Sequence, residues 1–256
     1  MRRETARARR IVVPAIALLV LLVAWELVVG TSIVPSYLLP APSQVARALV
    51  ADAPLMAQHA TTTLAEAAIG LGLGIVVGFV AAVTMDRFEV VALALEPLIT
   101  LSQTIPTVAI APLLVLWFGY GLAPKIVLIV LTTFFPVTIS LVGGFRSVDP
   151  DMIDLMRTMN ASDFQIFWHV KLPAALGELF SGLRISATYA IVGAVIAEWL
   201  GGFSGLGVYM TRVRKSFSYD RMFAVIILIS ALSLALMKLV DLLEYLCMPW
   251  KRAKDA

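Results

Sequence analysis

Residues 149–173 read DPDMIDLMRTMNASDFQIFWHVKLP, a charged and aromatic stretch that separates two long apolar runs. The tripeptide Asp149-Pro150-Asp151 is typical of a helix start. It offers a capping aspartate, then a proline at the first helical position, then an acid near the positive end of the helix dipole. We expect this helix to run to about Met159. Asn160 follows, and asparagine suits the left-handed backbone conformation that ends a helix.

A second short helix is predicted directly afterwards. Ser162 and Gln165 have the spacing of a capping box, and the helix should end by Pro173. It carries three aromatic side chains, Phe164, Phe167 and Trp168. The two helices would form a hairpin around a tight turn and present an apolar face. Two interpretations are open: the face packs against the spans or the lipid interface, or it docks a cytosolic partner.

On both sides of this stretch the composition is that of a membrane protein. The 256 residues are 60% hydrophobic and only 14% charged, with a mean hydropathy of +0.93, and a spanning helix needs about 20 mostly apolar residues. We predict an all-α fold with about six transmembrane helices, at 11–29, 60–85, 90–118, 125–143, 176–199 and 222–246. The first run could be a signal peptide, but its length and the lack of a cleavage motif favour a retained span.

Two of these runs carry features of their own. The second is rich in small residues, whose spacing lets helices approach closely in a membrane: Gly70, Gly72, Gly74 and Gly78. The third, 90–118, is interrupted by prolines and is interpreted as one kinked span. A turn is expected over 119–124, before the fourth span.

Charge sets the expected orientation. With the N-terminus inside, twelve Lys and Arg lie on the cytoplasmic side and six outside, leaving out Arg184 and Lys238 within spans. We expect residues 1–58 to hold the cytoplasmic N-terminal tail, the first span and an outer loop. Residues 59–247 would form the core, with the hairpin in the loop 144–175. Residues 248–256 would form a basic cytoplasmic tail.

Several chemistries are excluded or disfavoured. The single cysteine, Cys247, permits no internal disulfide. His59 and His169 lack companions at ligand spacing, so no metal site is predicted. The net charge of +3 is explained by loop placement rather than by nucleic acid. None of the six lysines follows a glycine, so the chain has no P-loop and no cofactor of its own.

The hairpin resembles the cytoplasmic loop of binding-protein-dependent ABC importer permeases, whose pattern is E-A-A, three residues, G, nine residues, then I-x-L-P. Aligned on Leu172-Pro173, that pattern places Asp154 at the Glu position, Leu155-Met156 at the two Ala positions, Asn160 at the Gly position and Val170 at the Ile position. Further stretches look like the nitrate/sulfonate/taurine branch of this family: 105–106, 109, 111–113, 116–119, 144–150, Glu198 and 205–207. Within that branch, the stretch Ser102-Gln103-Thr104-Ile105-Pro106 looks most like the thiamine-pyrimidine-precursor permeases.

The resemblance implies a permease subunit, not an enzyme, in the inner membrane of a bacterial cell. Two copies would form the pathway as a homodimer. Two separate ATPases would hold ATP and Mg, and an extracytoplasmic binding protein would deliver the solute. The residues expected to contact the ATPase are Asp154, Asn160, Ala161, Phe164, Phe167, Trp168 and Pro173.

Polar residues beside a helix break suit a translocation path; the alternative is that they satisfy backbone groups freed by the prolines. The predicted path residues are Ser102, Gln103, Thr104, Pro106, Tyr189 and Glu198. The stretch is uncharged, which favours an uncharged or cationic solute such as a thiamine-precursor pyrimidine over a sulfonate- or nitrate-like anion. Ionisable groups within spans are costly and often functional. They include Glu66, Glu198 and Arg184. Glu198 is expected to make either a structural bond or a gate contact. Arg184 is expected to pair with a carboxylate or to reach the interface.

Two rival functions remain. An ion-driven secondary transporter would need no docking hairpin and would often show two related halves, which the sequence lacks. A rhomboid-like intramembrane serine protease is suggested by the G-x-S-G pattern at 202–205, but no histidine follows Ser204 to act as its base.

Overall fold

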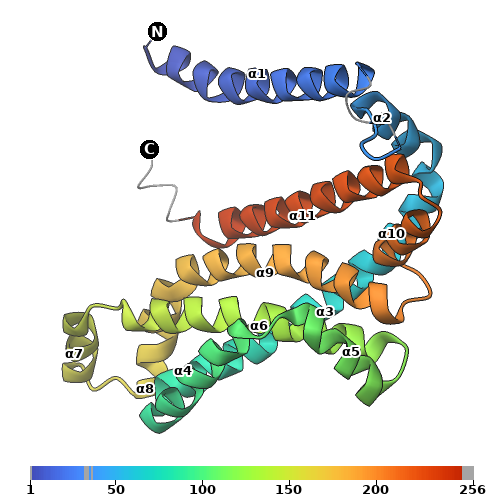
Figure 1. Ribbon diagram of the computed structural model, residues 1–256. Coiled ribbons are helices and arrows are strands. Elements are labelled where there is room, and N and C mark those ends of the chain that lie inside the picture. Colours follow the sequence, from blue (N-terminus) through green and yellow to red (C-terminus); the bar gives the residue numbers. More distant parts are fainter. Residues whose placement is uncertain (1, 32–34, 36, 250–256) are drawn as a thin grey trace. The chain divides into compact units, whose positions relative to one another are not determined.

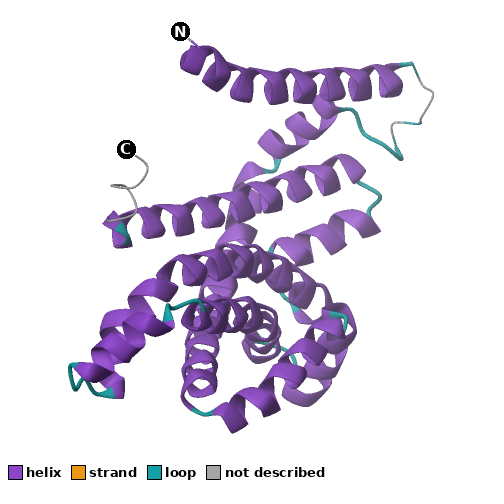
Figure 2. Ribbon diagram, turned by 90° about the vertical axis from the view of Figure 1, so that its left-hand side faces the viewer, coloured by secondary structure: helices purple, strands orange, loops and turns teal. Residues whose placement is uncertain are grey.

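The computed structural model describes residues 2–31, 35 and 37–249 (Figure 1). Every regular element in these residues is a helix, as the colours of Figure 2 show, so the predicted all-α fold is confirmed. Five of the described helices are long and apolar enough to cross a membrane, and a bent pair makes a sixth if it counts as one span. Most of the predicted basic tail lies outside the described residues.

The chain divides into two compact units. Unit 1 holds residues up to 58 together with 209–228, and unit 2 holds residues 59–208 and those from 229 onward. The predicted division into 1–58, 59–247 and 248–256 stays a prediction. Three helices run through a boundary between the units: α3 (Ala53–Arg87), α10 (Leu206–Lys215) and α11 (Tyr219–Cys247).

In unit 1, polar contacts join α1 (Arg2–Gly30) to the short α2 (Pro42–Ala51). The carboxylate of Glu26 on α1 accepts from the backbone N–H of Ser43 at 3.0 Å and from its hydroxyl at 2.7 Å. Asp52, just after α2, accepts from the Tyr209 hydroxyl at 2.6 Å and lies 3.3 Å from Nε of Arg221. Burial and the hydrogen bond to Asp52 raise the pKa of the Tyr209 phenol, so that hydroxyl stays a donor at physiological pH.

In unit 2, α6 (Leu122–Arg146) and α9 (Leu172–Gly201) run side by side and form the centre (Figure 1). Their contact surfaces bury branched and small side chains completely: Leu128, Ile129, Ala187, Ala190, Ile191 and Ala194. Small residues let the backbones approach closely, which drives helix association in lipid, where the hydrophobic effect does not.

Helix α3 packs on α6 through glycines. A Cβ at Gly78 would lie 2.7 Å from the carbonyl oxygen of Phe134. A Cβ at Gly70 would overlap Ile129, and one at Gly74 would overlap the Thr133 hydroxyl. The predicted close packing is therefore confirmed for these three glycines. Gly72 has open space around its Cα and takes no part.

The third apolar run is broken rather than gently kinked. Helices α4 (Glu89–Thr104) and α5 (Thr107–Phe118) meet at Ile105-Pro106 with a bend of 100°. Pro97 and Pro112 lie inside the two helices without ending them. The expected turn over 119–124 is too long, because α6 already begins at Leu122. Its Pro124 falls in the first turn, where a missing N–H costs no intrahelical bond.

The hairpin follows α6. Helix α7 (Pro150–Thr158) is capped by Asp149, whose side chain accepts from the Asp151 N–H, and Asn160 adopts a φ of 57°. Helix α8 (Asp163–Ile166) starts with the expected box, in which Ser162 Oγ accepts from the Gln165 N–H and the Gln165 side chain accepts from the Ser162 N–H. These three predictions are confirmed.

The predicted end of the second helix by Pro173 is wrong. Helix α8 continues through a π-helical segment, η1 (Phe167–Lys171), directly into α9. In η1 the N–H of Leu172 donates to the carbonyl of Phe167, five residues back. Proline cannot donate to an α-helical ladder and clashes with the carbonyl four residues earlier, and a widened π turn accommodates such a break. Pro173 therefore lies in the first turn of α9.

Candidate functional site

Helix α7 has no buried residue. Leu155 is 56% exposed and Met159, just after the helix, is 71% exposed, whereas Ile153 and Met156 are half-buried. Asp154 is exposed and lies 3.5 Å from Arg157 one turn later, and Asn160 is exposed while Ala161 is half-buried. An amphipathic helix that leaves apolar side chains exposed is suited to docking.

The three aromatic residues of α8 and η1 divide between outside and inside. Phe164 and Trp168 are exposed and their rings meet edge to face at 6.0 Å. Phe167 instead packs on Phe145 of α6, with ring centroids 5.5 Å apart, and Ile166 is buried. The predicted aromatic face is therefore smaller than the sequence suggests, because Phe167 anchors the hairpin to the spans.

Ion pairs fix the base of the hairpin to the end of α3. Nζ of Lys171 lies 2.8 Å from the Asp86 carboxylate in a partly buried pair, and Arg87 pairs with Asp163 at the start of α8. A cavity of about 600 Å³ lies between α3, α7 and α8. The hairpin is thus attached firmly on one side while α7 stays open on the other.

The predicted path residues lie on two parts of unit 2: the end of α4 with the break after it, and α9. Ser102 and Thr104 end α4 just before the break, where their hydroxyls donate to the carbonyls of Ile99 and Leu101. Gln103 and Pro106 are exposed beside them. Tyr189 is 47% exposed halfway along α9. The bonds of Ser102 and Thr104 are local to their helix, and the role of these residues in a path stays a prediction.

Glu198 is fully buried near the end of α9. Its carboxylate accepts from the Thr63 hydroxyl at 2.7 Å and from the Gly207 N–H at 2.6 Å. These bonds correspond to the structural alternative considered for this residue, and a gate role stays a prediction.

Two buried or partly buried ion pairs join helices far apart in the sequence. Nζ of Lys125 on α6 lies 2.6 Å from the carboxylate of Glu66 on α3, with both side chains at most 7% exposed. The sequence placed Lys125 at the outer end of the fourth predicted span, and only the apolar surroundings of Glu66 marked that residue as unusual. Arg184 on α9 pairs with Glu244 and lies 3.6 Å from Asp241, both on α11, so its expected pairing with a carboxylate is confirmed.

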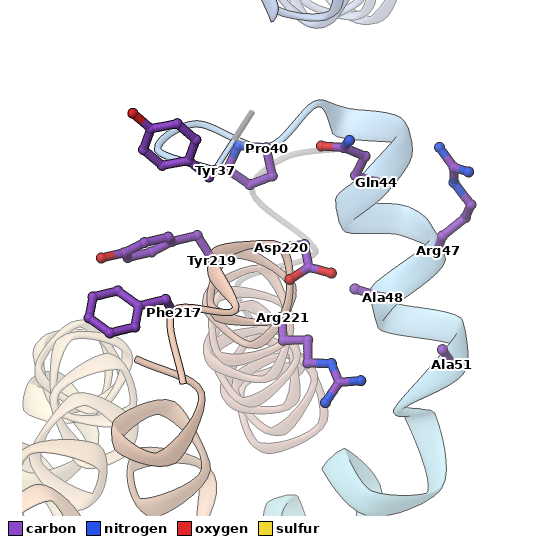
Figure 3. A pocket seen from close by; sticks show the side chains of 10 residues that line it. All are labelled: Tyr37, Pro40, Gln44, Arg47, Ala48, Ala51, Phe217, Tyr219, Asp220 and Arg221. Carbon is purple, nitrogen blue, oxygen red and sulfur yellow. The ribbon is translucent and has the colours of Figure 1, made fainter. Parts of the chain in front are cut away.

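Unit 1 contains a groove of its own, with a cavity of about 490 Å³ (Figure 3). Figure 3 shows Tyr37, Phe217 and Tyr219 gathered at one end and Arg47 at the other. Asp220 and Arg221 lie between them, at the start of α11. The groove therefore combines an aromatic end with charged groups of both signs.

A comparison with known families matches residues 74–246 to the family described as binding-protein-dependent transport system inner membrane component. The chain belongs to this family. It is therefore a permease subunit of an ABC importer, a multi-pass inner-membrane protein and not an enzyme. The family assignment supports neither the ion-driven transporter nor the protease.

The relatives of this permease are named as permeases, and each alignment covers most of both chains. It is 40% identical over 232 residues to a probable ABC transporter permease protein of Haemophilus influenzae, covering 91% of this chain and 95% of that one. It is 37% identical over 240 residues to the formylaminopyrimidine transport permease protein ThiX of Halalkalibacterium halodurans, covering 93% and 96%. It is 31% identical over 251 residues to the taurine transport system permease protein TauC of Escherichia coli, covering 95% and 91%.

Solved structures share the fold of this permease. A crystal structure of an amino acid ABC transporter with histidines aligns with a TM-score of 0.61 at 20% identity, covering 76% of this chain and 95% of that one. The inward-facing MetNI methionine ABC transporter aligns with a TM-score of 0.58 at 19% identity, covering 72% and 90%. The permease thus shares its helical fold with these two transporters.

Proposed function

We propose that the permease forms the solute pathway as a homodimer, is driven through α7 by two separate ATPase subunits, and receives its solute from an extracytoplasmic binding protein. The observation that carries this proposal is α7: a capped helix without a buried residue, held at a defined place by the ion pairs at its base. ATP and Mg would be bound by the partner. Both termini and the hairpin would be cytoplasmic.

The homodimer is supported by α1. Its apolar stretch, Val12–Gly30, is long enough to span the bilayer and almost none of it is buried. Lipid or a second copy of the chain can cover such a surface, and the proposal assigns part of it to the second copy. The groove of unit 1, in the outer loops of the proposed topology, is our candidate contact for the binding protein.

The docking role of α7 predicts the effect of Leu155→Ser. The variant should fold normally, because Leu155 is 56% exposed. It should bind the ATPase at least about tenfold more weakly, since burying a leucine contributes about 1.5–3 kcal/mol. Co-purification of the ATPase and ATP-dependent uptake into proteoliposomes measure the effect.

Leu38→Ser is the matched control, because Leu38 is also 56% exposed but lies in the outer loop of the proposed topology. Unchanged ATPase binding by Leu155→Ser would assign α7 to the lipid interface. Uptake by the permease reconstituted without any ATPase would contradict the whole proposal.

For the solute we propose an uncharged or cationic pyrimidine of the thiamine-precursor type. The break between α4 and α5 carries no charged residue over 97–118, so a permanently anionic solute would find no counter-charge there. The name of the 37% identical relative, a formylaminopyrimidine permease, supports the same class more than the 31% identical taurine permease supports an anion.

The partner binding protein provides the test for the solute. Formylaminopyrimidine at a hundredfold excess over its dissociation constant should stabilise that protein by about 2.7 kcal/mol, seen as a rise in melting temperature. Taurine and aliphatic sulfonates at the same concentration should leave the melting temperature unchanged. A shift with taurine alone would overturn the pyrimidine proposal while leaving the permease function intact.

A further inference from the structure

Three successive backbone N–H groups at the N-terminus of α10 are each bound by a side chain from another helix. The N–H of Gly205 donates to Nδ1 of His59 at 3.0 Å, that of Leu206 to Oγ1 of Thr63 at 2.8 Å, and that of Gly207 to Oε2 of Glu198 at 2.6 Å. The Thr63 hydroxyl donates in turn to Oε1 of Glu198 at 2.7 Å. We call His59, Thr63 and Glu198 the clamp.

The clamp replaces a local cap. The first N–H groups of a helix have no partner within it, and the residue before the helix usually supplies a side-chain oxygen. Here that residue is Gly205, which has no side chain. His59 and Thr63 are one turn apart on α3 and so face the same side, and Glu198 completes the set from α9. The start of α10 is therefore bound to both helices.

The clamp is dry and closely packed. The exposed fractions of His59, Thr63 and Glu198 are 7%, 0% and 1%. A buried carboxylate is tolerated only with hydrogen-bond donors around it. Losing the bond from Thr63 or from Gly207 would therefore leave part of the Glu198 carboxylate buried without a donor. Gly205 has a φ of 119°, and a Cβ there would overlap the Glu198 carboxylate. The loop before α10 thus lies directly against the last turn of α9 and has little freedom to move without it.

The end of α9 that lies away from Glu198 adjoins the hairpin. From Asp163 to Gly201 the chain is helical over 39 residues, which we call the rod. The rod begins where α7 is attached and ends just after Glu198. The rod includes the π segment η1, and its helical hydrogen bonding continues from the hairpin to Glu198.

We propose that Glu198 is a positioning residue of the transport cycle: through the clamp, a displacement of the rod by the ATPase is passed to α3 and α10 at the far end. The proposal rests on the proposed function, because it needs an ATPase acting on the hairpin. Helices α3 and α10 are two of those by which the chain enters unit 1, which holds the outer loops of the proposed topology. The clamp thus joins the far end of the rod to α3 and α10.

Hydrogen exchange tests the clamp in the whole transporter, with ATPase and binding protein, in lipid nanodiscs. In the wild type, the amides of 205–207 should exchange at rates that differ about tenfold or more between the nucleotide-free and the vanadate-trapped states. Glu198→Gln and Thr63→Val each weaken a hydrogen bond that slows amide exchange about tenfold. The amides of 205–207 should therefore exchange faster in both variants and in both nucleotide states. Their uptake should fall about tenfold while ATP hydrolysis continues.

Matched controls exist on the same helices. Glu178→Gln changes a carboxylate of the rod that lies five turns away from the clamp, near the hairpin end of α9. Thr84→Val removes a hydroxyl of α3 that donates to the carbonyls of Val80 and Ala81 in its own helix. Both should leave exchange at 205–207 and uptake unchanged.

Equal exchange at 205–207 in the two nucleotide states of the wild type would overturn the proposal. So would a parallel loss of uptake, ATP hydrolysis and melting temperature in Glu198→Gln, which is the result expected of a merely structural role. Uptake by the wild type in the same preparation tests the proposed function separately, because a clamp without mechanical role leaves that uptake intact.

Discussion

Replacing Lys125 by methionine should lower the free energy of unfolding of the permease by about 3–5 kcal/mol, the range found when one partner of a buried ion pair is removed. Methionine keeps the length of the side chain but not its charge. Glu66 would lose its 2.6 Å partner and remain buried in the same electrostatic neighbourhood as Glu198. Two carboxylates would then share an apolar site without a cation.

Comparison variants separate this effect from a general response to mutation. Lys238→Met is the control, because Lys238 is also paired, with Asp241, but its side chain is 73% exposed, and exposed pairs contribute about 0–1 kcal/mol. The double variant Lys125→Met/Glu66→Leu should recover most of the loss, since no uncompensated charge remains at that pair. Thermal unfolding in detergent measures all three, and equal melting temperatures for Lys125→Met and Lys238→Met would contradict the prediction.

The second large effect is expected from Gly78→Val. The new Cβ would lie 2.7 Å from the Phe134 carbonyl oxygen and 2.9 Å from Cβ of Val137 on α6. Part of this contact is with a backbone oxygen, which cannot move away by changing a side-chain rotamer. Helices α3 and α6 must therefore separate. Overpacking of this kind costs about 1–3 kcal/mol and occasionally more, and we expect the upper end because both elements are long helices.

Gly72→Val provides an internal comparison on the same helix. A Cβ added at Gly72 would have nothing within 4 Å of it, so valine meets open space there. The gain from replacing a helical glycine, up to about 1 kcal/mol relative to alanine, should leave Gly72→Val as stable as the wild type or slightly more so. If both variants lose the same amount of thermal stability, packing of α3 on α6 does not explain the role of Gly78.

Local rules predicted the hairpin well because its helix ends obey local chemistry. Asp149, Asn160 and Ser162 each act through groups within a few residues, and all three adopt the expected conformations. Pro173 failed as a stop signal because the π segment before it places it in the first turn of α9, where its missing N–H is tolerated, and because contacts from outside the local sequence hold that segment. Ile166 and Val170 are buried, and Phe167 packs on Phe145.

The buried polar contacts could not be predicted for a related reason. Lys125 meets Glu66 across 59 positions of sequence, and Glu198 meets Thr63 across 135. Periodicity places each residue on a helix face, but it does not say which two faces meet. Glu66 and Glu198 were recognisable as unusual because they lie in apolar runs, whereas Lys125, beside a turn, resembled an ordinary loop charge.

The π segment Phe167–Lys171 sets the rotational phase between the hairpin and the spans. A π turn accommodates one more residue than an α turn, and one residue corresponds to about 100° around a helix axis. Side chains before η1 therefore point about 100° away from where an unbroken α-helix would direct them relative to the face of α9. The direction in which Phe164 points is thus specified by the π segment that follows it, and that segment determines from which side of the permease a partner can approach.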